Sequence, residues 1–485
     1  MENTLIRPSS NGYDFLESYL TALYGERGTF RHNLQRYLSG KEFLNSCRAP
    51  TCIDDIPELT FETIRAQVVR EAHFCNRCDH ALAVYAKRQQ EQKLTKDDYY
   101  EIAGIMGLCP GQYDWHETLF PHLVDLFVSS EKEGNEIWKS VEKQPNIIEV
   151  MVSVMSNGLR SGQIIDYYNR HLWSQGYARN YFRGENAYNA HSRPSLFRNL
   201  SGDPCKARLQ KVIGNLQMIE FAIWLNGISF VQKWPYGDVF HGAIAQHYGI
   251  PTNGLDMTSD LKTALFFACC QYDSEKRKWR PLQQEEYKHA DLRPAVKARG
   301  GDARYGIIFS APVDVANMSR IANISDLRVT GVTPIGFQPF MRCSSQYGYI
   351  IEAGEPYDLY KDPSFSKHKF RHSPEICNWI FSEMDEGRHV YPQEMFGTCE
   401  DIVDTLKEQT LFSQQAYSMT LEHLKLEQYA VQIQAELEKQ GVQIVSSVRL
   451  CTEDRRQELE QSYWNAYNNH IYSATSPSIN IQFSI

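Results

Sequence analysis

Three short apolar runs, rich in Tyr, Phe and Ile, limit the folds that the middle of the chain can adopt. They read YARNYFRG from residue 177, YGIIFSAP from residue 305 and QYGYIIEAG from residue 346. Runs of this kind that end at Gly or Pro are typical of β-strands. Helical patterns lie between them, among them LQKVIGNLQMIEFAIWLNGISF and DLKTALFFACCQY. Strands interleaved with helices predict an α+β unit over residues 175–410.

Both flanks of this unit carry mainly helical patterns. Residues 1–170 include FETIRAQVVREAHFCNRCDHALAVYAKRQQEQ, whose apolar positions recur broadly every three or four residues. Residues 411–485 contain an amphipathic run over 418–441, a strand-like VQIVSSVRL and a helical pattern from residue 453. The final SPSINIQFSI alternates polar and apolar residues, as an edge strand does. We therefore expect a helical N-terminal region and a helical C-terminal extension with edge strands.

Composition excludes several classes of protein. The chain has 485 residues and a formal net charge of -9, so it offers no general basic surface for nucleic-acid phosphates. The N-terminus lacks the pattern of a secretory signal, and no window approaches the roughly 18 apolar residues of a membrane span. The 12 cysteines are scattered, which favours reduced thiols. We expect a cytoplasmic protein without a membrane segment.

The stretch HFCNRCDH, residues 73–80, contains residue types that bind zinc. It lies in the middle of a long helical pattern. There, the side chains of its two histidines and two cysteines would point in different directions around the helix axis. Its spacing to Cys47 and Cys52 is also unlike that of zinc fingers. We predict no metal site.

Several strings in the middle region follow the order of a known family. YFRGE is followed by RPSLFRN, then by AQHYGIPTNGLDMTSDLKTALFFA, and later by SSQYGYIIEAG and YPQEMFGTCEDIVDTLKEQ. Together with Glu220 in the intervening helix, they resemble the FRG domain, which is named for a Phe/Tyr-Arg-Gly motif. The chain departs from this family at three positions. Where the family commonly has Arg, Leu and Trp, it has Asn253, Gly254 and Met257.

The order of these motifs is also similar, more distantly, to that of ADP-ribosyltransferases. Those enzymes have an arginine at the end of an early strand, then a Ser/Thr-rich strand before a small-residue helix, and later a strand that opens with Gln or Glu. Arg183, Thr258 and Gln346 occur in this order. The similarity implies split small antiparallel sheets with helices. It also implies a nucleotide-handling enzyme, an ADP-ribosyltransferase or NAD glycohydrolase, with NAD as substrate.

The chemistry of NAD suggests roles for the residues in these strings. A guanidinium at a strand end can bind phosphates bidentately, so we assign Arg183 to them, and Gly184 would let the ligand approach the backbone. Thr258 or Ser259 would hold the nicotinamide ribose, and His247 is a candidate acid–base group. The other expected nucleotide-binding residues are Tyr248, Thr252 and Asp256.

The enzyme interpretation lacks an obvious carboxylate. Cleaving a glycosidic bond builds positive charge on the sugar, which a carboxylate normally stabilises. Gln346 occupies the expected position, but a glutamine has no negative charge. Glu352 lies six residues further along the strand, about 20 Å away, and Glu185 and Asp256 are the other candidates. The sequence leaves open which carboxylate replaces the usual one.

Other interpretations stay open as well. Gln346 favours a non-catalytic module that binds a nucleotide or nucleic-acid end, with helical flanks that recruit a protein partner. A phosphodiester-cleaving enzyme could use His247 and Asp256. Arg183 could instead pair with Asp256 or Glu220 as a structural clamp, and His247 could be a core residue. A toxin, stress or defence effector would suit the chemistry of the NAD-dependent alternative.

Overall fold

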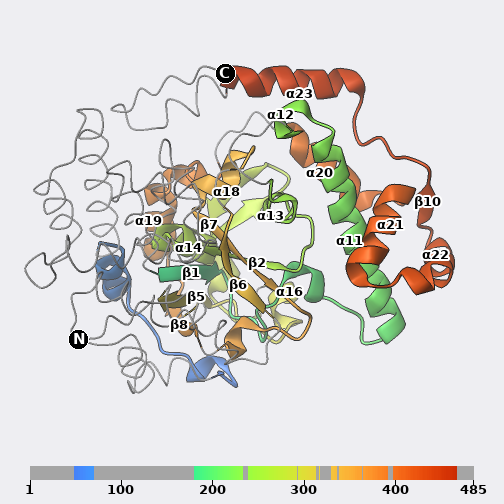
Figure 1. Ribbon diagram of the computed structural model, residues 1–485. Coiled ribbons are helices and arrows are strands. Elements are labelled where there is room, and N and C mark those ends of the chain that lie inside the picture. Colours follow the sequence, from blue (N-terminus) through green and yellow to red (C-terminus); the bar gives the residue numbers. More distant parts are fainter. Residues whose placement is uncertain are drawn as a thin grey trace, which may run out of the picture.

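The computed structural model describes residues 49–69, 180–232, 239–291, 293–312, 316, 329–335, 338–362, 364–391 and 397–466. A β-sheet lies at the centre of the described part, and helices α21 (Gln414–Leu424) and α22 (Ala430–Lys439) lie beside the long helix α11 (Pro204–Asn226) (Figure 1). Most of the region 1–170 and the zinc-like stretch 73–80 lie outside the described residues.

The central sheet has six strands, and every neighbouring pair in it is antiparallel. Helices lie between the strands in the order of the chain, so the predicted α+β class is confirmed. The strand order is β6-β7-β2-β1-β5-β8. The strands are β1 (Asn180–Glu185), β2 (Gly254–Thr258), β5 (Tyr305–Pro312), β6 (Val329–Pro334), β7 (Gly348–Ala353) and β8 (Ser366–Arg371).

This sheet consists of two three-stranded halves that meet at a narrow junction. Strand β1 pairs with β5 along its whole length, and β2 pairs with β7 along its whole length. Between β1 and β2, in contrast, only Phe182 and Thr258 are in register. The side chain of Arg183 bridges the gap, because its Nη1 donates a hydrogen bond to the backbone carbonyl of Asp256 at 2.8 Å. The halves therefore diverge beside Arg183.

Both faces of the sheet are buried, and alternate residues face two different cores. On β1, Tyr181 belongs to one apolar cluster and Phe182 to the other. Ile307 and Ile308 divide in the same way on β5, as the two-residue period of a strand requires. The first cluster includes apolar residues of the segment 357–365, and the second includes α14 (Leu261–Cys269) and α19 (Pro374–Glu383).

Helix α14 approaches β1 closely, and this explains a glycine that the sequence assigned to ligand access. A Cβ on Gly184 would lie 1.7 Å from the carbonyl oxygen of Ala264, inside α14. The close approach that this glycine permits is therefore that of the helix backbone. Gly184 also does not end the strand, since β1 continues to Glu185.

A second layer of helices lies around α11 (Pro204–Asn226), whose N-terminus is capped by Asp203. The C-terminal extension packs on this helix through a shared apolar cluster (Figure 1). Glu220 is buried there and accepts a hydrogen bond from the backbone N–H of Ser413 at 2.8 Å. It therefore joins α11 to the extension, and the alternative in which it pairs with Arg183 is wrong. The extension contains β9 (Leu411–Ser413), α21 (Gln414–Leu424), α22 (Ala430–Lys439), β10 (Gln443–Val445) and α23 (Glu453–Ala466).

The run 418–441, which the pattern predicts as one amphipathic stretch, forms two helices. The break lies at Lys425, which has φ 57 and ends α21 in the left-handed conformation. Strands β9 and β10 pair in parallel. The strand predicted in VQIVSSVRL is therefore confirmed, although it covers only three residues.

The remaining elements surround the sheet and α11, and the helices at residues 229–232, 241–247, 341–345 and 397–408 share a further apolar cluster. The remaining elements are the hairpin β3 (Cys270–Asp273) and β4 (Lys278–Pro281), with α12 (Ser229–Gln232), α13 (His241–His247), α15 (Gln284–Tyr287), α16 (Pro294–Lys297), α18 (Met341–Ser345) and α20 (Gly397–Glu408). The N-terminal segment 49–69 adds to the sheet edge. There, the Leu59 N–H donates to the Lys369 carbonyl at 2.7 Å, and the Lys369 N–H donates to the Pro57 carbonyl at 2.9 Å.

The first prediction concerns Gly184. We expect Gly184→Ala to destabilise the protein by about 3 kcal/mol or more, because the new methyl group overlaps rigid helix backbone. Gly202→Ala is the matched control, since a Cβ there meets nothing within 4 Å. Denaturant unfolding of both variants measures the difference. Equal stability of the two variants would contradict the close packing of α14 on β1.

The second prediction concerns the bridge across the sheet junction. We expect Arg183→Lys to lower the free energy of unfolding by about 1–3 kcal/mol, because an ammonium group cannot reproduce the forked guanidinium contacts. Arg388→Lys, at an exposed arginine outside the sheet, is the control. Urea unfolding followed by fluorescence tests this expectation. An unchanged midpoint would show that the bridge does not hold the halves together.

Candidate functional site

A cavity of about 590 Å³ lies at the narrow junction between β1 and β2. Its wall comes from both strands, from the chain that follows β1, from α14 and from the region of α16. Arg183 and Thr258, which the sequence placed in one site, both line it. The lining residues are Phe182, Arg183, Gly184, Glu185, Asn186, Ala187, Asn189, His191, Arg193, Arg198, Asp256, Met257, Thr258, Thr263, Ala264, Phe267, Arg293, Val296, Arg299 and Gln346.

Arg183 is held on two sides by the protein itself. Its Nε donates to Oε1 of Glu185 at 3.1 Å, and its Nη1 donates to the Asp256 carbonyl at 2.8 Å. Only 12% of its side chain is exposed, so these contacts fix the guanidinium. No described residue hydrogen-bonds its Nη2. Arg183 therefore acts as a structural clamp whose remaining donors are available at the cavity wall.

Both carboxylate oxygens of Glu185 accept hydrogen bonds from neighbouring residues. Besides Arg183, it accepts a hydrogen bond from the Ser192 hydroxyl at 2.6 Å and from Nδ2 of Asn189 at 3.4 Å. Its side chain is 10% exposed. These contacts neutralise its charge and occupy both oxygens, so Glu185 serves to orient Arg183 and the turn after β1.

Asp256 is in a different situation. Its side chain is 41% exposed and lines the cavity, while its buried Oδ1 has no hydrogen-bond partner. Nε2 of His247 lies 3.9 Å from that oxygen, which is beyond hydrogen-bond distance. Burial lowers the pKa of His247, and the charge of Arg342 adds to this effect, although the charge of Asp256 opposes it. Asp256 therefore has no direct hydrogen-bonded ion pair among the described residues, although its charge acts on nearby Arg198.

The hydroxyl of Thr258 and the amide of Gln346 are used within the fold. Thr258 donates to the backbone carbonyl of Gln346 at 2.8 Å and accepts from the Asp260 N–H at 3.0 Å. Nε2 of Gln346 donates to the Val390 carbonyl at 2.9 Å. The backbone N–H of Ser259 donates to the Tyr347 carbonyl at 3.2 Å. These contacts tie β2 to the start of β7.

Four expected site residues do not line this cavity, namely His247, Tyr248, Thr252 and Ser259. Tyr248 is buried at 5% exposure in the cluster around α13, and its ring lies 4.3 Å from the guanidinium carbon of Arg342. The expectation that the cleft exposes Tyr248 is therefore wrong. Thr252 is also buried and hydrogen-bonds Gln246. Ser259 follows β2 on the way to α14 and contributes no atom to the lining.

The cavity wall carries five arginines and only two carboxylates. Arg193 has a buried Nε without a hydrogen-bond partner. Arg198 donates its Nε to the Arg193 carbonyl at 2.8 Å. Although the Arg198 side chain reaches solvent, desolvation by the surrounding protein and the charges of Arg183 and Arg299 lower its pKa, while the charges of Glu185 and Asp256 oppose this shift. The arginines therefore repel one another, and an anion in the cavity would relieve that repulsion.

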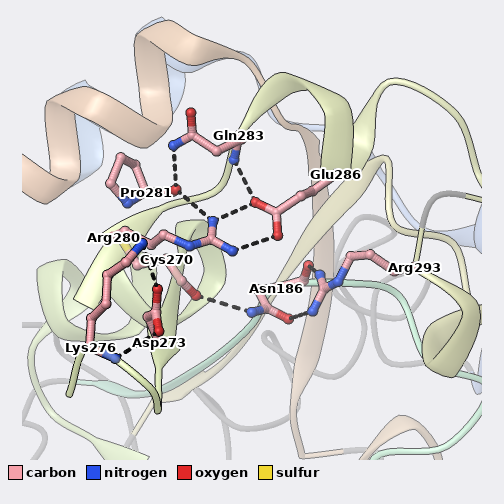
Figure 2. A network of polar contacts seen from close by, with 9 residues as sticks. All are labelled: Asn186, Cys270, Asp273, Lys276, Arg280, Pro281, Gln283, Glu286 and Arg293. Atoms are coloured by element: carbon pink, nitrogen blue, oxygen red, sulfur yellow. Dashed lines mark hydrogen bonds and ion pairs between the residues drawn. The ribbon is translucent and has the colours of Figure 1, made fainter. Parts of the chain in front are cut away.

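Arg293 is positioned by a polar network beside the cavity (Figure 2). Its Nη1 donates to the Asn186 carbonyl at 2.7 Å and its Nη2 to Oδ1 of Asn186 at 2.9 Å. Nδ2 of Asn186 in turn donates to the Cys270 carbonyl at 3.0 Å. Arg280 and Glu286 form a nearby bidentate pair in the same network. The network holds the turn after β1 against β3.

His191 also lines the cavity, although no motif in the sequence pointed to it. Its Nδ1 lies 2.6 Å from Oδ2 of the buried Asp358. The two residues are 167 positions apart in the chain, so no local pattern joins them.

Within the described residues, no group of three or more His, Cys, Asp or Glu side chains is placed to hold a metal ion. The prediction for residues 73–80 lies outside those residues and stays a prediction. A membrane-spanning helix, long and apolar enough, is likewise not found in the described part of the chain.

The comparisons with known proteins identify one family. Residues 178–277 match the family model for the FRG domain, a span that begins before β1 and includes α11, β2 and α14. The match covers the first part of the resemblance expected over 175–410. Four lining residues lie beyond it, namely Arg293, Val296, Arg299 and Gln346. Neither a curated protein nor a solved structure matches the chain. Residues 178–277 of the chain therefore contain an FRG domain, as the sequence motifs predicted.

Proposed function

We propose that the FRG domain binds NAD in the cavity beside Arg183 and cleaves the bond between nicotinamide and ribose, either in hydrolysis or in transfer of ADP-ribose. The observation that carries this proposal is the composition of the wall, in which five arginines accompany a carboxylate that no cation pairs. Arginine side chains bind phosphates, of which NAD has two. The carboxylate can stabilise the positive charge that develops on the ribose.

The phosphate-binding role falls mainly to arginines other than Arg183. Arg183 donates hydrogen bonds to Glu185 and to the Asp256 carbonyl, and both Nη atoms of Arg293 donate to Asn186. Arg193 and Arg198 keep more of their guanidinium donors for a ligand. The carbonyl that joins them fixes one against the other, which favours joint contact with a diphosphate.

Asp256 takes the place of the carboxylate that the sequence could not locate. It lies on β2 beside Arg183, whose Nη1 holds its backbone carbonyl. Part of its side chain is exposed in the cavity, and no described cation pairs it. A carboxylate in a partly desolvated site stabilises a ribosyl cation more than it would in water. We therefore assign Asp256 to the ribose.

The split of the sheet supports the similarity to ADP-ribosyltransferases, which the sequence suggested from the order of motifs. The two halves diverge at one register pair beside the arginine. NAD is an intracellular metabolite, so the proposal favours action in the cytoplasm, where a toxin, stress or defence effector would find its substrate.

A non-catalytic nucleotide-binding module is the second candidate function. The observation that favours it is the hydrogen bond from Gln346 to the Val390 carbonyl, because that amide is then not free to orient a ribose. In this case the same arginines would bind a nucleotide, and the helical flanks would recruit a protein partner. Release of nicotinamide separates the two functions, since a binding module releases none.

The third prediction tests nucleotide binding. We expect Arg198→Gln to weaken NAD binding by about tenfold to a hundredfold, because it removes a charge-assisted contact to phosphate. Arg388→Gln, an exposed arginine outside the cavity wall, should bind as the wild type does. Calorimetric titration of NAD into all three proteins measures the effect. If the wild type binds neither NAD nor a related nucleotide, the nucleotide proposal fails.

The fourth prediction tests catalysis. We expect Asp256→Asn to reduce the rate of nicotinamide release by about 100-fold or more, because the amide cannot stabilise the ribosyl cation. Its affinity for NAD should stay within about threefold of the wild type. Asp404→Asn, at an exposed aspartate of α20, is the control. Wild-type protein that binds NAD without releasing nicotinamide would support the binding module instead.

A further inference from the structure

His191 and Asp358 form a pair at the cavity wall that the arginines and Asp256 do not explain. Nδ1 of His191 lies 2.6 Å from Oδ2 of Asp358. The aspartate is only 1% exposed, whereas 52% of the histidine side chain is exposed. His191 lines the cavity together with Asp256. One member of the pair is therefore fixed in the protein, and the other is open to a ligand.

The surroundings of Asp358 fix the direction of the hydrogen bond. Its Oδ1 accepts from the backbone N–H of Ser192 at 3.0 Å and from that of Tyr360 at 3.2 Å. A carboxylate that accepts two backbone N–H groups is suited to accept a third donor, and Nδ1 of the histidine is that donor. His191 then carries its proton on Nδ1, and its Nε2 keeps a free lone pair.

A purely structural role would account for the aspartate but not for the histidine. Asp358 caps the short 3₁₀-helix at Leu359–Lys361 and holds the turn at Ser192, and these tasks need no imidazole. No described residue hydrogen-bonds Nε2 of His191. The same turn also holds Glu185 through the Ser192 hydroxyl. The histidine is therefore held by the same turn that contacts Glu185 of the cavity wall.

We propose that His191 is the general base of the site and that Asp358 is its positioning residue. This inference rests on the proposed cleavage of NAD. A water molecule or an acceptor hydroxyl at the cavity mouth gives its proton to Nε2 as its oxygen bonds to C1′ of the ribose. The bond from C1′ to the ring nitrogen breaks, and its electron pair stays on nicotinamide, which leaves neutral. The proton passes from His191 to solvent after each turnover.

The experiment compares wild type, His191→Gln, His191→Ala, Asp358→Asn and the control His423→Gln, an exposed histidine on α21. NAD affinity is measured by calorimetry and nicotinamide release by chromatography. We expect His191→Gln to bind NAD within about threefold of the wild type and to release nicotinamide about 100-fold more slowly. Added imidazole should restore part of the rate to His191→Ala, which a structural role would not allow.

Nitrogen NMR of histidine-labelled full-length protein tests the positioning role without any turnover. We expect the Nδ1-protonated form for His191 in the wild type and a shift toward the Nε2-protonated form in Asp358→Asn. An Nε2-protonated His191 in the wild type would overturn the assignment of Asp358.

The possible failures can be told apart. If the wild type binds and cleaves NAD and His191→Gln is as fast, the base role is overturned while the proposed function stands. If the wild type binds NAD and releases no nicotinamide, both the base role and the enzyme proposal are overturned. If the wild type binds no nucleotide, the proposed function fails. The base role, which needs NAD as its substrate, fails with it.

Discussion

The hydrogen bond from Arg183 to the Asp256 carbonyl is the contact on which the rest of the site depends. It crosses the one place in the sheet where backbone pairing nearly stops, because β1 and β2 share a single register pair. A normal ladder there would close the space that the cavity occupies. A junction without any bridge would leave β1 and β2 free to separate. The guanidinium keeps the strands at a spacing that opens a cavity and still fixes the backbone of Asp256.

The charges of the wall residues distinguish this cavity from the rest of the protein. Glu185 compensates Arg183, and Asn186 holds Arg293 without neutralising it. The other arginines of the wall, Arg193, Arg198 and Arg299, have no carboxylate partner among the described contacts. One carboxylate, Asp256, cannot balance them. The whole chain is acidic, with a formal net charge of -9, so this local excess of positive charge is a property of the site rather than of the surface at large. An anion of at least two charges fits it best.

Local patterns predicted the parts of this fold that depend on local chemistry. The strand YGIIFSAP is β5 with the expected bounds, and the mostly apolar run after Asp260 forms α14, although this helix ends at Cys269 and the last three residues of the predicted helix lie in β3. The shared position of Arg183 and Thr258 followed from motif order. Other features depend on packing between distant segments. Gly184 serves α14 rather than a ligand, Tyr248 is buried, and Asp358 reaches His191 across 167 positions. The periodicity of the sequence does not predict those contacts. Each of them forms only when the sheet is assembled in the strand order β6-β7-β2-β1-β5-β8.

The substitution of Gln346 for a carboxylate has a physical explanation in this geometry. A second carboxylate at that position would lie near Asp256, since both residues line the same cavity and both influence His247. Two like charges in one partly buried site raise the energy of both, and one of them would take up a proton. Glutamine avoids this repulsion and instead ties the start of β7 to the Val390 carbonyl. Under the proposed function, the carboxylate that stabilises the ribose is therefore Asp256 on β2, where Arg183 holds the backbone, while Gln346 ties the start of β7 to residue 390.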